Sequence, residues 1–251
     1  MKMKKYLFTA IVAALPICVH AQSADTKITD GKRIWTTEFE SIDINAPIKV
    51  TLKQIDDNSA PCVIYDDHGC EPSAFTAAVD KKGVLKIREK SDGKRSSVTE
   101  VEVFYHDLED IRIARADVLF RDTLARSIAD IDICDGAHVR ATIDMDDIKL
   151  NISGKCVVEL AGHARYITVA VSSSSLDASA LGCMACRITA SHKSDITVDV
   201  DERLEAEVSY GAKIGYSGSP SIVRKNISTF GGEIVDNDIN TVDISSDAAH
   251  E

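Results

Sequence analysis

Apolar residues return at an interval near 19 residues through the second half of this chain. One series, spaced by 18, 19, 19, 19 and 18 positions, consists of Ile113, Ile131, Leu150, Val169, Ile188 and Ala206. Two positions later, a second apolar series contains Ile133, Ile152, Val171, Ala190 and Val208, with polar residues between the two. Apolar residues two apart are typical of a strand with one buried face, and their return at a short fixed interval predicts strands stacked in parallel.

A third apolar column has the same period. It contains Val139, Val158, Leu176, Ile196 and Ile214, at spacings of 19, 18, 20 and 18. Gly, Ser and Asp gather between the columns, as in Asp135-Gly136, and such residues favour tight turns. We therefore predict an all-β fold, a parallel β-helix (β-solenoid) whose rungs of about 19 residues each hold two short strands and a corner.

The N-terminal half is less regular but also predicts strands. Residues 75–79 and 84–87 flank a Lys81-Lys82-Gly83 turn, which predicts a hairpin or a tight corner. The open ends of a solenoid need covering, and we expect loops, the strands between Phe39 and Leu52, or another subunit to do this. A homo-oligomer would satisfy the last of these alternatives.

The N-terminus has the features of an export signal. Lysines are followed by an apolar stretch and by small residues at Val19-His20-Ala21, a pattern typical of a secretory signal peptide. Cys18 raises the question of lipidation, although the preceding Ile17 fits a lipoprotein signal poorly. No later stretch has the roughly 18 apolar residues that a transmembrane helix needs. The predicted parts are a signal peptide (1–21), a flexible N-terminal segment (22–38), a single β-solenoid domain (39–240) and a polar tail (241–251).

Charge and cysteine content narrow the function classes. The whole chain has a net charge of −11, and removal of the leader lysines makes it −14, which argues against nucleic acid as a partner.

Six cysteines remain after the leader, and an exported chain permits disulfides. Cys62 and Cys70 flank a turn-like stretch. We predict that a disulfide between them can close a small loop. Bridges are not expected among the other four, which fall in different columns: Cys134, Cys156, Cys183 and Cys186.

The order of these segments resembles a known family, the putative auto-transporter adhesin, head-GIN domain family. The matching segments are Phe39-Glu40-Ser41-Ile42-Asp43-Ile44, Ile48-Lys49-Val50-Thr51-Leu52, Gly83-Val84-Leu85-Lys86-Ile87, Leu204-Glu205-Ala206-Glu207-Val208-Ser209-Tyr210-Gly211 and Tyr216-Ser217-Gly218-Ser219-Pro220. The resemblance implies a right-handed parallel β-helix and an exported protein of a double-membraned bacterium. This chain departs from the family where Ser172–Ser175 and His192-Lys193 stand in place of corner glycines.

Two outward columns can be examined for the grouped acids that a β-helical polysaccharide lyase or hydrolase would need. They read Asp132, Asn151, Ala170, Thr189, Glu207 and Asp130, Lys149, Thr168, Arg187, Glu205. Neither is a ladder of acids. Asp130 with Lys149, and Arg187 with Glu205, are instead predicted to be ion pairs between adjacent rungs that solvate this face.

Three other clusters carry a functional and a structural interpretation. Asp144-Met145-Asp146-Asp147 is a calcium candidate or a solvated corner, and it lacks the glycine-bearing loop of a full calcium site. Cys183 and Cys186 have the spacing of a redox pair or half a zinc site, but Cys186 shares a column with Ile148 and is expected to be a small buried side chain. Arg88, Lys90, Lys94 and Arg95 form either a basic loop for an anionic polymer or a soluble turn.

The sequence therefore predicts an exported, non-enzymatic β-solenoid, an interaction or adhesin-like module of the cell envelope. Its expected location is the periplasm or the cell surface, and its expected partner is a glycan or another envelope protein. No catalytic residue, metal ligand or cofactor site is predicted. Thirteen aromatic residues are few for a sugar-stacking platform. The alternative is a β-helical polysaccharide lyase or hydrolase, which would bring acids and a lysine or arginine together in one groove.

Overall fold

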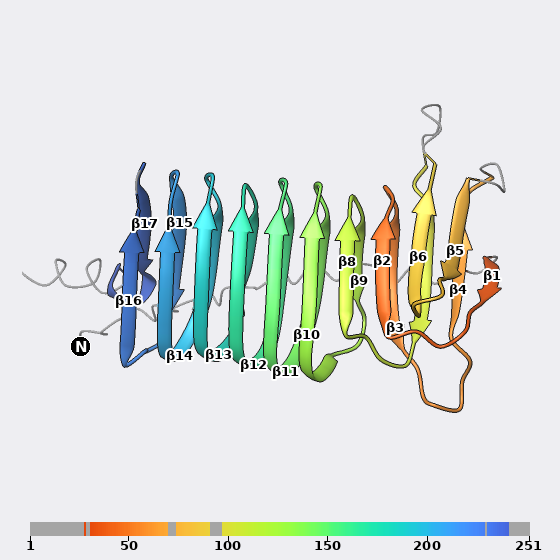
Figure 1. The fold of residues 1–251 in the computed structure, drawn as a ribbon, viewed down its shortest axis with the longest axis horizontal. Helices are drawn as coiled ribbons and strands as arrows, with labels where there is room; N and C mark the ends of the chain where they lie inside the picture. The colour runs from red at the N-terminus through yellow and green to blue at the C-terminus, as the bar shows by residue number, and fades with distance from the viewer. Residues whose placement is uncertain (1–27, 29–30, 70–73, 91–96, 229, 241–251) are drawn as a thin grey trace, which may run out of the picture.

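The computed structural model describes residues 28, 31–69, 74–90, 97–228 and 230–240. The predicted signal peptide, Cys18, Cys70 and the predicted tail lie outside these residues. Within them the chain forms an elongated stack of strands (Figure 1). The strands before the repeat are β1 (Lys32–Trp35), β2 (Ser41–Asn45), β3 (Lys49–Gln54), β4 (Cys62–Asp66), β5 (Phe75–Val79), β6 (Val84–Glu89) and β7 (Glu100–Tyr105).

The repeat itself begins at β8 and ends in one short helical turn. Its elements are β8 (Asp110–Ala114), β9 (Asp117–Phe120), β10 (Leu124–Cys134), β11 (His138–Ser153), β12 (Val157–Ser172), β13 (Ser175–Ser191), β14 (Asp195–Val208), β15 (Ala212–Ser217), β16 (Ile222–Ile227), β17 (Gly232–Asp236) and α1 (Asn237–Asn240). Neighbouring rungs pair in parallel throughout this part, as the period predicts. The parallel β-solenoid is therefore confirmed.

The predicted columns are confirmed in the rungs from β10 to β14. Leu150 lies opposite Ile131 on one side and Val169 on the other, and all three are buried. In the other arm of the rung, Val139 pairs with Val158, and that column continues through Leu176, Ile196 and Ile214. A single buried cluster extends from Phe39 to Tyr216, so burial of aliphatic side chains stabilises the whole stack.

The predicted register is wrong by two residues for the first member of the first apolar series. Ile111, and not Ile113, pairs with Ile131, while Ile113 pairs with Ile133. The interval between these rungs is thus 20 residues instead of 18. A shift of two residues leaves every side chain on its predicted face, because the side-chain period of a strand is two, so the apolar pattern does not reveal it.

The rungs do not stack in sequence order at the N-terminal end. The rung formed by β2 and β3 lies between the β6–β7 rung and the β8–β9 rung, and it pairs in parallel with both (Figure 1). The chain thus adds a rung on one side of β2–β3 and then crosses to continue on the other. Of the three alternatives expected to cover an open end, the one that names the strands between Phe39 and Leu52 is wrong, because these strands form an internal rung.

Antiparallel strands cover the N-terminal end instead. β5 pairs with β6 as the predicted hairpin, β4 pairs with β7, and β1 pairs in turn with β4. Part of the segment predicted to be flexible, residues 22–38, is therefore strand β1. Antiparallel strands oppose further parallel stacking at this end, because they change the hydrogen-bonding pattern that a further parallel rung would have to match.

The opposite end exposes its last rung among the described residues. All six residues of β16 are exposed, including Ile222, Val223 and Ile227. The exposed fractions of these three side chains are 46, 38 and 56 %. The two ends of the stack are therefore different surfaces.

From β11 to β14, each rung turns sharply at only one of its two ends. The sharp corners carry residues with positive φ, among them Ser173 at 53°, His192 at 56° and Lys193 at 59°. These are the positions where the resemblance would place glycine, so left-handed backbone is kept here without it. The buried Ser174 and Ser194 turn their hydroxyls to backbone carbonyls of the corner, which satisfies both hydroxyls.

The other corner differs from the predicted break between two short strands. β11 to β14 run through it as continuous strands of 14 to 17 residues. In β12 the bend contains Gly162, with a φ of 108°, directly opposite Ile143 of β11. Ladder hydrogen bonds therefore continue around this corner, with register shifts where β13 meets its neighbours.

Replacing Tyr105 in β7 with phenylalanine is expected to stabilise the fold. The Tyr105 hydroxyl is buried without a hydrogen-bond partner among the described residues, and burial raises the pKa of this phenol. An unsatisfied buried hydroxyl costs about 1–3 kcal/mol, so Tyr105→Phe should raise the free energy of unfolding by up to about 1 kcal/mol. Denaturant titration measures this change, with Tyr210→Phe at a half-exposed ring as the control. A loss of stability in Tyr105→Phe would show that the hydroxyl is bonded.

Candidate functional site

One outer face of the solenoid carries two columns of polar side chains along its length. Both ion pairs predicted on it are confirmed. Lys149 Nζ lies 3.1 Å from Asp130 Oδ1, and Arg187 Nη2 lies 2.8 Å from Glu205 Oε2. In each pair the two residues are directly opposite each other on adjacent rungs, which is why the sequence register found them.

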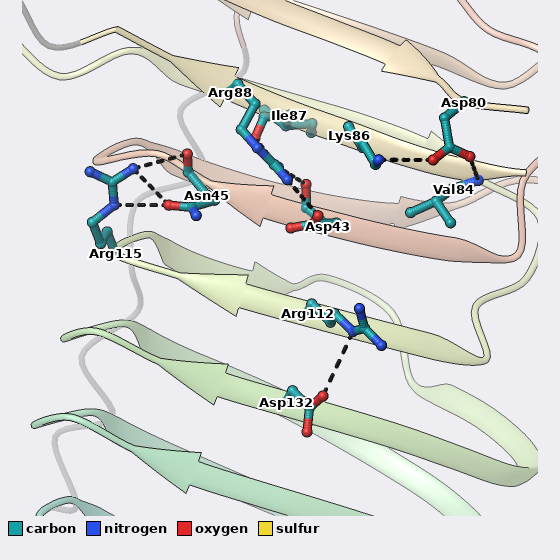
Figure 2. Close-up of polar contacts among 10 residues, drawn as sticks. All are labelled: Asp43, Asn45, Asp80, Val84, Lys86, Ile87, Arg88, Arg112, Arg115 and Asp132. Carbon is teal, nitrogen blue, oxygen red and sulfur yellow. Dashed lines mark hydrogen bonds and ion pairs between the residues drawn. The ribbon is translucent and has the colours of Figure 1, made fainter. Parts of the chain in front are cut away.

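The same face continues over the N-terminal rungs (Figure 2). Asp43, Arg112 and Asp132 follow one another in a single column of β2, β8 and β10. Arg112 Nε lies 3.7 Å from Asp132 Oδ2, and Lys86 Nζ lies 2.9 Å from Asp80 Oδ2. Exposed pairs of opposite charge each contribute only about 0.2–1 kcal/mol, so both pairs mainly solvate the face, and the Arg112–Asp132 pair, which joins neighbouring rungs, also helps fix register.

The predicted basic loop is wrong for one of its four residues. Arg88 lies in β6, where Nη2 is 2.5 Å from Asp43 Oδ2 and Nη1 donates to the Asp43 carbonyl (Figure 2). A guanidinium held by an acid on the adjacent rung is part of the solvated face and not of a loop. Lys90 is exposed after the strand, whereas Lys94 and Arg95 lie outside the described residues.

Glu205 in β14 stands out on this face because three arginines bind it. Arg187, one rung before it, places Nε 2.9 Å and Nη2 2.8 Å from Oε2. Arg224 in β16, one rung after it, places Nη1 3.0 Å from Oε1, which also accepts a hydrogen bond from Arg203 in the same strand. One carboxylate thus holds three guanidinium groups from three successive rungs in a fixed arrangement.

The arginines should keep Glu205 ionised in strong acid. Hydrogen bonds from Arg203 and then from Arg187 lower its pKa from 4.5 to about 2. Because the folded pKa is the lower one, the stabilisation is fully present above pH 4.5 and is lost as the pH falls through about 2. Carbon-13 NMR titration of the carboxyl group should give a midpoint near 2, moving toward 4.5 in Arg203→Ala. A midpoint near 4.5 in the native chain would contradict the arrangement.

A shallow groove of about 490 Å³ opens beside this cluster. Tyr166, Ala185 and Arg203 occupy one column on β12, β13 and β14. The small Ala185 leaves a hollow between the two larger side chains, and Tyr166 keeps 47 % of its surface exposed. We use the name arginine groove for the surface formed by Tyr166, Ala185, Arg187, Arg203, Glu205, Ser221 and Arg224.

The calcium candidate is not assembled into a cation site. Asp144, Asp146 and Asp147 are exposed along β11, and the buried Met145 separates the first two. In the part of the chain that the structure describes, no three His, Cys, Asp or Glu side chains are placed together so as to hold a metal ion. These exposed carboxylates therefore agree with the alternative interpretation of this cluster, a solvated corner.

Cys186 is a buried core residue, as predicted. It lies between Ile167 and Leu204 of the adjacent rungs. A hydrogen bond with Cys183 and burial both raise its pKa, so the thiol is kept protonated and unreactive. Cys183 is also buried and donates to the Asp199 carbonyl at 3.1 Å. The predicted Cys62 to Cys70 bridge stays a prediction, since Cys70 lies outside the described residues.

The sequence pattern missed two of the arginines and the aromatic side of the groove. Arg203 precedes Glu205 by two residues and therefore points to the same outer face, a signal that period-two counting could have found. Arg224 belongs to the last rung, where the apolar columns end, so no buried pattern fixed its register. Tyr166, Ala185 and Arg203 are 19 and 18 positions apart, so the period could also have placed them in one column.

These features define a class of protein: a parallel β-solenoid with an aliphatic spine and a polar, solvent-exposed outer face. Residues 38–220 match the family described as putative auto-transporter adhesin, head GIN domain. The chain belongs to this family, which confirms the resemblance seen in the sequence. No helix in the described residues is long and apolar enough to span a membrane.

Solved structures share the fold. A putative adhesin from Bacteroides fragilis is 20 % identical, with a TM-score of 0.71, and the match covers 82 % of this chain and 95 % of that one. A putative adhesin from Parabacteroides distasonis is 18 % identical, with a TM-score of 0.60 over 82 % and 96 % of the two chains. A protein of the same organism described as a putative lipid binding protein gives the same values. No curated protein sequence matches this chain.

Proposed function

We propose that this chain is exported and acts as a non-enzymatic, adhesin-like binding module of the cell envelope, in the periplasm or at the cell surface. Its partner would be a glycan or another envelope protein. Membership of an adhesin family supports the proposal, and so does the signal-like N-terminus.

One structural observation carries the proposal: the outer columns are separated from the core along the whole repeat. Leu150, Val169 and Ile188 are buried in one column, while the adjacent outward positions hold residues as different as Asn151 and Thr189. Outward side chains can therefore change without disturbing the spine. A rigid face with freely variable side chains suits recognition, because little conformational entropy is lost on binding.

Export and binding are tested separately. The full chain and a version lacking residues 1–21 are expressed in a double-membraned bacterium, and only the full chain should reach the envelope fraction and shed its leader. The purified mature chain is then applied to a glycan array and used to capture envelope proteins. Saturable binding of a glycan or an envelope protein is expected. Retention of both versions in the cytoplasm, or the release of cleaved sugars from a polysaccharide, would contradict the proposal.

A further inference from the structure

Resting on the proposed function, we propose that the arginine groove binds the carboxylate groups of an acidic glycan, such as a chain of uronic acids. The proposal names the ligand class and the residues that would take it, and it follows from the charge, donor geometry and width of the groove.

Three guanidinium groups gather around one carboxylate beside the groove, on a protein that is acidic as a whole. Arg187, Arg203 and Arg224 all bind Glu205, so positive charge exceeds negative charge at this point, while the whole chain carries −11. On the Tyr166 side, the guanidinium carbon of Arg165 lies 5.4 Å from the centre of the Tyr166 ring, and Asp147 lies opposite Tyr166 on the preceding rung. An anionic ligand would thus be attracted here and repelled by the acidic remainder of the surface.

The guanidinium groups are ordered and still have donors to offer. Each carries five N–H groups, and Glu205 takes two from Arg187 and one each from Arg203 and Arg224. Glu205 therefore fixes the positions of the arginines at the rim of the groove, and it leaves N–H donors on each of them for a further acceptor. A planar guanidinium matches a carboxylate through two parallel hydrogen bonds, so an external carboxylate is a fitting additional ligand.

The width of the groove fits one sugar ring. Tyr166 and Arg203 are two rungs apart with Ala185 between them, and two strand spacings amount to about 9–10 Å. The half-exposed Tyr166 offers an apolar ring edge at one side, and Ser221 offers a hydroxyl near the other. Arg187 and Arg224 both reach Glu205 from the adjoining column, so their guanidinium groups lie together at one side of the groove.

A sugar acid fits this surface better than a phospholipid does. A lipid would need an enclosed apolar cavity for its acyl chains, whereas the groove is shallow, open and lined by charged side chains along one side. A free phosphate would use the arginines but would leave the Tyr166 ring and the length of the groove unused. The test therefore includes both a carboxylate probe and inorganic phosphate.

The experiment uses short oligogalacturonates and their neutral methyl esters with the full mature chain. Calorimetric titration should give saturable binding of the acid and at least about tenfold weaker binding of the ester. Arg187→Ala and Arg224→Ala should each weaken oligogalacturonate binding about tenfold or more, and Arg187→Lys should restore part of the loss. Tyr166→Ala should also weaken it.

Arg112→Ala is the matched control, since Arg112 is ion-paired on the same face but lies several rungs away. It should bind like the unchanged chain, and all variants should keep their thermal midpoint. Equal binding by the groove variants, equal binding of the ester, or displacement by phosphate as effective as by galacturonate would overturn the inference. If the chain binds a neutral glycan or a protein, and Arg187→Ala does not change that binding, the inference about the groove is overturned and the proposed function still stands.

Discussion

Gly162→Ala should lower the free energy of unfolding by about 3 kcal/mol or more, one of the two largest single-residue effects expected in this chain. The Gly162 backbone has a φ of 108°, which an L-residue with a side chain rarely adopts. A Cβ placed there would lie 2.2 Å from the carbonyl oxygen of Ile143 and 3.1 Å from its nitrogen. Both atoms belong to the backbone of the adjacent rung, so the clash is relieved only by moving two paired strands apart.

Gly136→Ala separates the clash from the backbone strain. Gly136 also has a positive φ, 77°, but a Cβ there would meet no atom within 4 Å. Its replacement should cost only the left-handed strain of about 1–2 kcal/mol. Chemical denaturation of both variants measures the difference. Equal losses would mean that the bend in β12 adapts easily and that the continuous corner is not tightly packed.

Ile44→Ala should lower the free energy of unfolding by about 2–5 kcal/mol. Ile44 is fully buried in β2, where it lies opposite Ile87 on one side and Ile113 on the other. Truncation removes methyl groups from a close-packed spine, and the two flanking rungs cannot both move in to fill the space. Because β2 and β3 form the rung shared by the N-terminal cap and the repeat, the loss should also reduce cooperativity between these two parts.

Ile227→Ala is the control for Ile44→Ala because both residues belong to the same column. Ile227 stands at its far end in β16, opposite Val208, and is 56 % exposed. Its replacement should change stability by no more than about 0.5 kcal/mol. Thermal and denaturant midpoints of the two variants test this contrast. A large effect at Ile227 would indicate that a further layer covers the last rung.

The candidate site was only partly predictable, for reasons that lie in particular residues. Arg187 and Glu205 are 18 positions apart in a regular part of the repeat, so their pairing followed from the period. The convergence of three arginines did not, since it also depends on a neighbour within one strand and on the final rung. The column of Tyr166, Ala185 and Arg203 also follows from the period, but the hollow beside Ala185 depends on how the two flanking side chains pack, which only the structure shows.

The sequence by itself determined the kind of coil: parallel strands, rungs of about 19 residues, and which side chains enter the spine. These follow from alternation along each strand and from a repeat interval, both of which are local in the chain. Only the tertiary structure decided that the β2–β3 rung lies between β6–β7 and β8–β9, that antiparallel strands cover one end, and that Ile111 pairs with Ile131. The physical reason is that buried aliphatic rungs present nearly interchangeable faces, and a slip of two residues keeps every face intact. The order of rungs is therefore set by how the whole chain closes its core, and not by any one segment.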